Sequence, residues 1–212
     1  MKPLGKINLK WTPNLAYIVG YIVADGYLSC DGRHIDITSV EKAHLEKIKR
    51  ALGVYVKIGR KSSGNNKYGY RLQFGDILFY KFLKNIGLTP RKSKTLGKIM
   101  LPDDYFPHFL RGVFDGDGCT YSYFDPRWKN SFMLYLVICS ASENFIKWLQ
   151  KEIIFYTGAK GRIYDNRKRA RVLQLRYAKK ESLIIIKYMY SGGGLFLDKK
   201  KLKIKESLSI LD

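Results

Sequence analysis

The sequence predicts an α+β protein built from two similar halves. Hydrophobic residues recur at helical spacing in some segments and alternate in others, so helices and strands are interleaved along the chain. An apolar segment that ends in Asp-Gly occurs twice, at Asp25-Gly26 and at Asp117-Gly118. The segments that follow the two copies come in the same order, which indicates an internal repeat.

The first half begins with a helix. Thr12 and Pro13 combine a capping residue with proline at the first helical position, and Gly26 is the expected end of this helix. The elements expected after it are a strand at 34–38, an amphipathic helix at 41–52 closed by Gly53, strands at 54–61 and 68–74 around a turn at 62–66, and a short helix at 77–85.

The second half repeats this plan. Pro102, Asp103 and Asp104 precede its apolar segment and are expected to cap a helix that ends at Gly118. The elements expected after it are a strand at 132–140, a helix at 142–157, strands at 161–164 and 169–177 around a turn at Asp165-Asn166, a helix at 180–189, and a lysine-rich helical tail from Asp198. We therefore expect subdomains at 1–88 and 105–212, joined by a linker at 89–104.

The composition limits the classes of protein that fit the chain. Its 39 Lys and Arg residues against 18 Asp and Glu give a formal net charge of +21, which indicates a polyanionic partner. No apolar stretch reaches the roughly 20 residues that cross a bilayer, so no membrane partner is expected. Three cysteines without a CxxC pair and three histidines without ligand spacing argue against a disulfide scaffold and a zinc site. We expect an intracellular protein, in the cytoplasm, the nucleoid or an organelle matrix.

Small residues line one face of each predicted motif helix. Residues four apart share a face of a helix, so two such faces allow two helices to pack closely. The small residues are Ala16, Gly20 and Ala24 in the first helix and Gly112 and Gly116 in the second. If the helices pair side by side and parallel, their ends bring Asp25 and Asp117 together. One Asp-Gly alone is an ordinary helix end, but two mid-helix glycines at the same register, each costing about 1 kcal/mol relative to Ala, favour a functional contact.

Two neighbouring carboxylates at helix C-termini require cations, because like charges repel and the helix ends add partial negative charge. Mg²⁺, or another divalent cation such as Mn²⁺, binds a few carboxylates together with water and phosphate oxygens. Metal ions in such a setting activate water and stabilise the leaving oxygen of a phosphodiester. The pattern therefore predicts metal-assisted hydrolysis, with Asp25 and Asp117 as metal-binding and catalytic residues.

The two motif segments resemble the signature of the LAGLIDADG homing endonucleases, in particular the single-chain type with two copies of the motif. Residues 18–26 and 110–118 match the nine-letter signature. The resemblance implies two pseudo-symmetric αββαββα subdomains joined along the motif helices, with saddles of antiparallel strands over DNA. It places Asp25 and Asp117 at the catalytic eighth position of each motif.

The resemblance also implies roles for residues around the two acids. The backbone carbonyls of Ala24 and Gly116 are the expected further metal ligands. Lys180 is the expected basic residue that polarises the scissile phosphate or the attacking water, although Lys179 and Lys180 are equally interpretable as solvated charges at the start of a helix. Less typical residues occupy three other family positions, namely Ser39, Ser140 and Asp76.

Alternation in the strands separates an apolar inner face from a polar outer face. Arg71 and Gln73 in the first half and Gln174 and Arg176 in the second point outward, and such groups suit guanine and adenine edges in the major groove. The residues expected to extend this DNA-binding surface are Lys57, Lys61, Arg162, Tyr164, Arg167 and Lys168, with hairpin tips at Asn65-Asn66 and Asp165-Asn166. Any single Arg or Lys among them is explained as well by a phosphate contact or a solvated charge, but the repetition in both halves favours recognition.

The sequence thus predicts a monomeric, site-specific double-strand DNA endonuclease whose target is long and largely asymmetric. The lack of a flanking splicing domain favours a free-standing enzyme. Three alternatives stay open: an RNA maturase that binds intron RNA, a non-cleaving DNA-binding regulator of the same fold, and a basic ribosome-associated protein. The tail lysines either contact the DNA backbone or form the solvent-exposed face of a helix. They are Lys199, Lys200, Lys201, Lys203 and Lys205.

Overall fold

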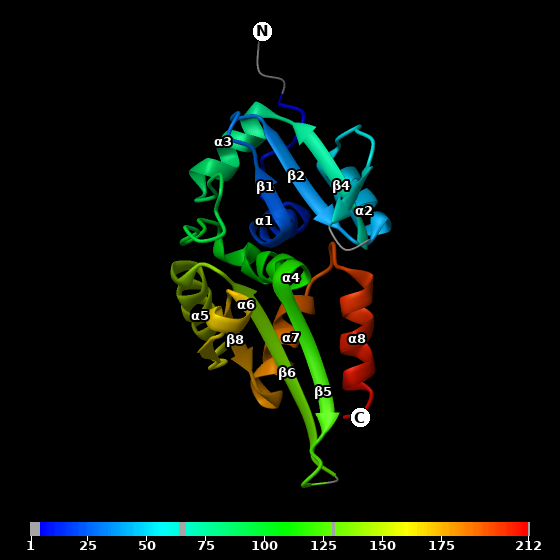
Figure 1. Ribbon diagram of the computed structural model, residues 1–212, viewed down its shortest axis with the longest axis vertical. Coiled ribbons are helices and arrows are strands. Elements are labelled where there is room, and N and C mark those ends of the chain that lie inside the picture. The colour runs from blue at the N-terminus through cyan, green and yellow to red at the C-terminus, as the bar shows by residue number, and fades with distance from the viewer. Residues whose placement is uncertain (1–4, 64–66, 129, 212) are drawn as a thin grey trace.

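The computed structural model describes residues 5–63, 67–128 and 130–211, and the second half repeats the order of elements of the first with three short or terminal helices added (Figure 1). The first half contains α1 (Pro13–Asp25), β1 (Gly26–Leu28), β2 (His34–Ser39), α2 (Lys42–Leu52), β3 (Gly59–Ser63), β4 (Lys67–Gly75) and α3 (Ile77–Asn85). The second half contains the 3₁₀ turn η1 (Asp103–Tyr105), α4 (Phe106–Asp117), β5 (Gly118–Phe124), β6 (Phe132–Ser140), α5 (Glu143–Thr157), β7 (Arg162–Asp165), α6 (Arg167–Ala170), β8 (Leu173–Tyr177), α7 (Lys179–Tyr190) and α8 (Asp198–Leu208). The predicted α+β class and the repeated order are confirmed.

Each half contributes one four-stranded antiparallel sheet within the described part of the chain. The strand orders are β1-β2-β4-β3 and β5-β6-β8-β7, so the two sheets are topological copies. Ile37 lies opposite Leu72 in the first sheet, and Ile138 lies opposite Leu175 in the second. All four side chains are buried, which places the inner faces of both sheets on one hydrophobic core.

Local signals explain why the main helices begin and end where they do. The Thr12 hydroxyl accepts a hydrogen bond from Leu15 N at 3.1 Å and caps α1, and Ser142 caps α5 in the same way. Gly53 and Gly158 end α2 and α5 with φ of 65° and 70°, a backbone conformation that glycine adopts without strain. No helix in the described ranges is long and apolar enough to cross a membrane.

Three sequence-based expectations about elements were wrong. The strand expected at 54–61 begins only at Gly59. The strand expected at 169–177 begins at Leu173, because the short helix α6 includes the first two residues of that expected strand. The predicted side-chain cap at the start of α4 is absent, since residues 102–104 lead into η1 and Tyr105 takes the cap position without a side-chain bond. The strands β1 and β5, which follow the two motifs directly, were not predicted.

Candidate active site

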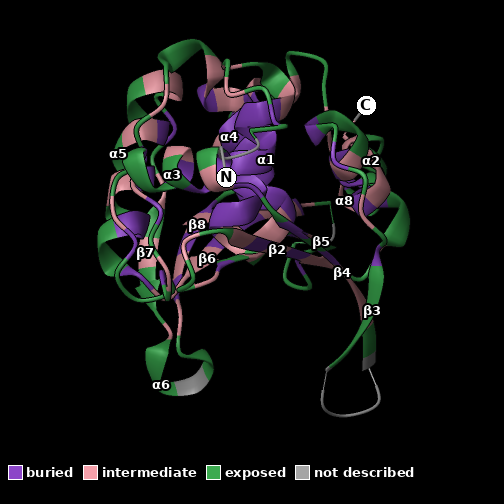
Figure 2. Cartoon of the chain, turned by 90° about the horizontal axis from the view of Figure 1, so that it is seen from above, coloured by how far each residue is buried: buried purple, intermediate pink, exposed green. Residues whose placement is uncertain are grey.

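The helices α1 and α4 pack against each other through their glycines at the centre of the molecule. A Cβ atom added to Gly20 would lie 2.1 Å from the Phe109 carbonyl oxygen, and one on Gly112 would lie 2.1 Å from the Tyr17 carbonyl oxygen. Both distances are far inside van der Waals contact, so only glycine fits at either position. Figure 2 shows these helices as the most fully buried part of the chain. The two predicted small-residue faces therefore meet.

This packing brings the two motif carboxylates to one place. A Cβ on Gly116 would lie 2.3 Å from the Ala24 Cβ and 3.5 Å from Asp25 N, so the C-terminal ends of the two helices are adjacent. Asp25 and Asp117 are both exposed to solvent at these ends. The predicted convergence of the two acids is thus present in the structure.

Each carboxylate keeps an open face, but the helix ends around it displace part of its water. This desolvation raises the pKa of Asp117 to about 6, with a further contribution from the negative charge of Asp25. Desolvation also raises the pKa of Asp25. Lys92 and Lys200 oppose the shift at both acids. The pair therefore carries unfavourable charge that cations relieve.

Two lysines that sequence analysis did not assign to the site contact these helix ends. Lys92 is buried, and its Nζ lies 3.4 Å from the Ala24 carbonyl oxygen. The Nζ of Lys200 donates to carbonyl oxygens at the end of α4, with distances of 2.8 Å to Phe114, 2.7 Å to Asp115, 3.2 Å to Gly116 and 2.6 Å to Gly118. Each carbonyl expected to bind a metal is thus already in contact with an ammonium group.

Two buried charged residues of α4 hold the segment that carries Lys200. The Asp115 carboxylate accepts hydrogen bonds from the Tyr17 hydroxyl and from Leu197 N, both at 2.7 Å. The Arg111 guanidinium donates to a row of backbone carbonyls, at 2.6 Å to Met189, 2.8 Å to Leu195, 2.9 Å to Gly193 and 3.3 Å to Gly192. Helix α8 is therefore anchored to the motif helix and not a loose tail.

We expect Arg111→Leu to lower the free energy of unfolding by about 2 kcal/mol. The substitution removes a charged donor from the buried Met189 carbonyl and from three part-buried carbonyls, and hydrogen bonds to charged groups contribute about 1.5–3 kcal/mol each. Urea denaturation followed by circular dichroism measures the change. Arg50→Leu is the matched control, because Arg50 is exposed on α2 and its loss should cost less than about 0.5 kcal/mol. An equal cost for both variants would contradict the anchoring role.

The raised pKa of Asp117 predicts a pH-dependent difference between the metal-free wild type and Asp117→Asn. Between the ordinary value of 3.8 and about 6, the folded protein holds a proton that the unfolded chain has released. The free energy of unfolding therefore rises as the pH falls through 6, and the gain is complete below about 4. Because solvent screens the exposed carboxylate, we expect a gain of the order of 1 kcal/mol. Urea denaturation with chelator from pH 4.5 to 8 measures it, and a pH-independent difference between the two proteins would contradict it.

Of the other family positions, Ser39 lies beside Asp25, because both residues line one pocket together with Thr38 and Lys61. Lys180 is exposed at the first turn of α7 and, among the described residues, is not one of the cations that act on Asp25 or Asp117. Asp76 is buried and caps α3 by accepting from Phe79 N at 2.9 Å. Ser39 and Ser140 accept from the backbone N–H two residues later, at 3.1 Å each, and so shape the starts of α2 and α5.

The residues predicted to read base edges form an equivalent pair on each sheet. Arg71 Nη2 donates to Gln73 Oε1 at 2.8 Å, and Arg176 Nη2 donates to Gln174 Oε1 at 3.1 Å. Lys57 precedes β3 and Lys61 lies on it, and both side chains are exposed. Arg162 is exposed on β7. In both halves the strands turn an apolar face to the core, and the outer faces carry these Arg–Gln pairs.

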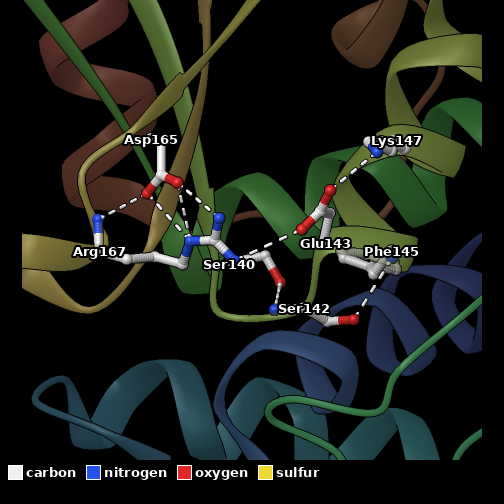
Figure 3. A network of polar contacts seen from close by, with 7 residues as sticks. All are labelled: Ser140, Ser142, Glu143, Phe145, Lys147, Asp165 and Arg167. Carbon is white, nitrogen blue, oxygen red and sulfur yellow. Dashed lines mark hydrogen bonds and ion pairs between the residues drawn. The ribbon is translucent and has the colours of Figure 1, made fainter.

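Strand β3 and helix α6 extend beyond the two sheets on the same side of the molecule (Figure 2). On α6, Lys168 is exposed, while Arg167 pairs with Asp165 at 2.5 Å and with Glu143 at 3.4 Å (Figure 3). A phosphate contact by Arg167 would therefore have to compete with these carboxylates. The predicted tip at Asn65-Asn66 lies outside the described residues.

The donors at the helix ends suit a hard divalent cation. In the described ranges, no group of three or more His, Cys, Asp or Glu side chains is placed to hold a metal ion. The helix ends instead offer two carboxylates and the carbonyls of Ala24 and Gly116, which are oxygens only. Mg²⁺ takes such donors and fills its remaining positions with water and phosphate oxygens.

Comparison with known proteins agrees with this architecture. Residues 12–87 match the family model of the LAGLIDADG-like domain, a range that includes the first motif. The chain has the LAGLIDADG fold. This confirms the resemblance on which the expected fold was based. No curated protein matches the sequence.

Several solved structures share the LAGLIDADG fold. The meganuclease I-AabMI bound to uncleaved DNA matches with a TM-score of 0.63 and 17% identity, covering 94% of this chain and 90% of that one. I-SmaMI bound to an uncleaved DNA target in the presence of calcium ions matches with a TM-score of 0.63 and 18% identity, covering 95% and 91%. I-DmoI has been solved in complex with DNA and Mn.

The same fold occurs in full-length DUF199/WhiA from Thermatoga maritima, with a TM-score of 0.58 and 16% identity. The match covers 93% of this chain but spans only 60% of the WhiA chain. Because the meganucleases and WhiA share one fold, the activity of this chain has to be argued from its site.

Proposed function

We propose that this LAGLIDADG protein is a metal-dependent, site-specific double-strand DNA endonuclease. The observation that carries the proposal is the meeting of Asp25 and Asp117 at the ends of two glycine-packed helices. These ends lie between two sheets whose outer faces carry the same Arg–Gln pair. A net charge of +21 supplies the attraction to DNA phosphates.

The similar structures support both the partner and the cofactor. I-AabMI and I-SmaMI are bound to DNA, and the I-SmaMI and I-DmoI structures name calcium and manganese. By this analogy the present chain binds duplex DNA across its two sheets and uses a divalent cation such as Mg²⁺ or Mn²⁺. We further propose that it acts as a monomer inside the cell, since one chain supplies both motifs.

Different residues of the chain would have different roles in phosphodiester hydrolysis. A bound divalent cation supplies charge stabilisation and a more acidic water. Asp25 and Asp117, with the carbonyls of Ala24 and Gly116, hold the cation at the helix ends. The sheets hold the duplex so that one phosphate lies over this point. Water would add to phosphorus and lose a proton to solvent, while one P–O ester bond of the strand breaks and its leaving oxygen takes up a proton.

A second candidate function is nucleic-acid binding without cleavage, as in an RNA maturase or a DNA-binding regulator. The observation that favours it is the contact of Lys92 and Lys200 with the carbonyls of Ala24 and Gly116. These ammonium groups neutralise the partial negative charge of the helix ends without any metal ion. Both candidates predict DNA or RNA binding, but only the first predicts hydrolysis.

Selection of cleaved molecules from a randomised duplex pool separates the two candidates. The full chain is incubated with the pool in Mg²⁺, in Mn²⁺ and in chelator, and the cut molecules are sequenced. We expect cleavage at one long site with either metal ion, no cleavage in chelator, and retained binding in Ca²⁺. Firm binding to DNA or RNA without cleavage under any of these conditions would reject the endonuclease and favour the second candidate.

A further inference from the structure

The two sheets differ on their outer faces although their registers match. The pairing of Ile37 with Leu72 corresponds to that of Ile138 with Leu175. This correspondence aligns the outer-face residues of β2 and β6, so that His34, Asp36 and Thr38 match Tyr135, Val137 and Cys139. The central strand is therefore polar on the outer face of the first half and largely aromatic and apolar on that of the second.

Strands β5 and β7 add further tyrosines to the outer face of the second sheet. The pairs across strands are Tyr121 with Tyr135, Tyr123 with Met133, and Tyr164 with Gln174. The rings of Tyr121 and Tyr123 stack on the Tyr135 ring, with centroids 5.0 and 6.3 Å away and planes inclined by 17° and 15°. Because Tyr121 and Tyr135 are stacked, each has one face partly covered and offers its ring edge and hydroxyl group to a ligand.

Cationic side chains border this tyrosine cluster. The Arg176 guanidinium lies 4.8 Å from the centre of the Tyr164 ring, and Arg162 lies opposite Arg176 on β7. Tyr123 and Tyr164 are 44% and 43% exposed, so the cluster is accessible. The strands β5 and β6 also extend it along a long hairpin (Figure 1). Apolar side chains can contact base edges, and the neighbouring arginines can contact the phosphates beside those bases.

We infer that the outer face of the second sheet reads thymine 5-methyl groups in the half-site that the C-terminal half binds; this inference rests on the proposed function. The thymine methyl is the apolar group that base edges present in the major groove. The ring edges of the tyrosine cluster and the Met133 side chain can make van der Waals contact with this methyl group. On the first sheet the position of Val137 is taken by Asp36, which pairs with Arg71 at 3.8 Å, so an apolar methyl group finds no matching surface there.

The geometry favours duplex DNA over unpaired bases as the ligand of this face. Recognition of single-stranded RNA or DNA uses open aromatic faces on which bases stack. In the tyrosine cluster, the Tyr121 ring covers part of one face of Tyr135, and the Arg176 guanidinium lies over one face of Tyr164. The ligand of this face is therefore a duplex segment whose thymines lie over the cluster.

Replacement of thymine by uracil tests the inference, because it removes the methyl group and keeps the base pairing. Duplexes of the selected target carry uracil in one half-site at a time, and binding is measured in Ca²⁺. We expect substitution in the C-terminal half-site to weaken binding about fourfold for each methyl that packs on the cluster. Substitution in the other half-site should change binding less than about twofold. Tyr135→Ala should abolish the difference, whereas His34→Ala, at the equivalent position of the first sheet, should keep it.

The outcomes separate this inference from the proposed function. Equal binding of the thymine and uracil duplexes would overturn the inference and leave the endonuclease standing. If the protein neither bound nor cut any duplex, the proposed function would be rejected, and the inference that rests on it would be rejected as well. Tighter binding of a single-stranded oligonucleotide than of the duplex, lost in Tyr135→Ala, would show that the cluster stacks unpaired bases. The uracil comparison uses wild-type protein, so it holds even if Tyr135→Ala does not fold.

Discussion

Asp117→Asn is expected to abolish DNA cleavage while DNA binding stays close to that of the wild type. The amide keeps the shape of the side chain but removes one of the two charges that draw a cation to the helix ends. Loss of that charge should lower the cleavage rate at least about 10³-fold. Binding relies on the sheets, which the substitution does not touch. Single-turnover cleavage of the selected duplex in Mg²⁺ and a binding titration in Ca²⁺ measure the two effects.

A metal-dependent stability measurement supports this prediction without relying on activity. Mg²⁺ should raise the melting temperature of the wild type and leave that of Asp117→Asn unchanged. Asp104→Asn is the matched control, because Asp104 is exposed in η1, and it should behave as the wild type in both assays. Cleavage by Asp117→Asn at the wild-type rate would remove this carboxylate from the mechanism.

The parts of the fold that could be predicted from sequence are those with local signals. The Thr12 and Ser142 caps and the Gly53 and Gly158 stops act within one helical turn, so their helices were placed within a few residues. The repeat of the Asp-Gly motif also predicted the internal symmetry. Mid-helix glycines predicted the meeting of α1 and α4, because a close backbone approach is the physical reason to keep glycine there.

The parts that sequence analysis missed depend on contacts between distant segments. Lys92 reaches the site from the connection between halves, and Lys200 reaches it because Arg111 and Asp115 fix the path of the chain before α8. Among five tail lysines, nothing local distinguishes Lys200 from its neighbours. Arg111 and Asp115 lie inside the second motif, and a charged pair on an otherwise buried helix was the available signal.

Gly112→Val is expected to lower the free energy of unfolding by about 3–5 kcal/mol. Its Cβ would lie 2.1 Å from the Tyr17 carbonyl oxygen and 2.8 Å from Tyr21 N, so the atoms that must move belong to the backbone of α1. Overpacked sites usually cost about 1–3 kcal/mol when side chains can adjust, and a rigid helix backbone adjusts less. Urea denaturation measures the loss. Gly97→Ala is the matched control, because nothing lies within 4 Å of its added Cβ, and it should stay within about 1 kcal/mol of the wild type.

The same substitution tests whether the close helix contact also builds the cation site. Separation of α1 from α4 would move Asp25 away from Asp117, since both acids are placed only by the ends of these helices. We therefore expect folded Gly112→Val, studied at low temperature, to lose both the Mg²⁺-dependent rise in melting temperature and cleavage, while Gly97→Ala keeps both. Gly20→Val should behave like Gly112→Val, because the contact is reciprocal. A variant that is destabilised but still stabilised by Mg²⁺ as strongly as the wild type would mean that the two carboxylates do not need this packing to share a cation.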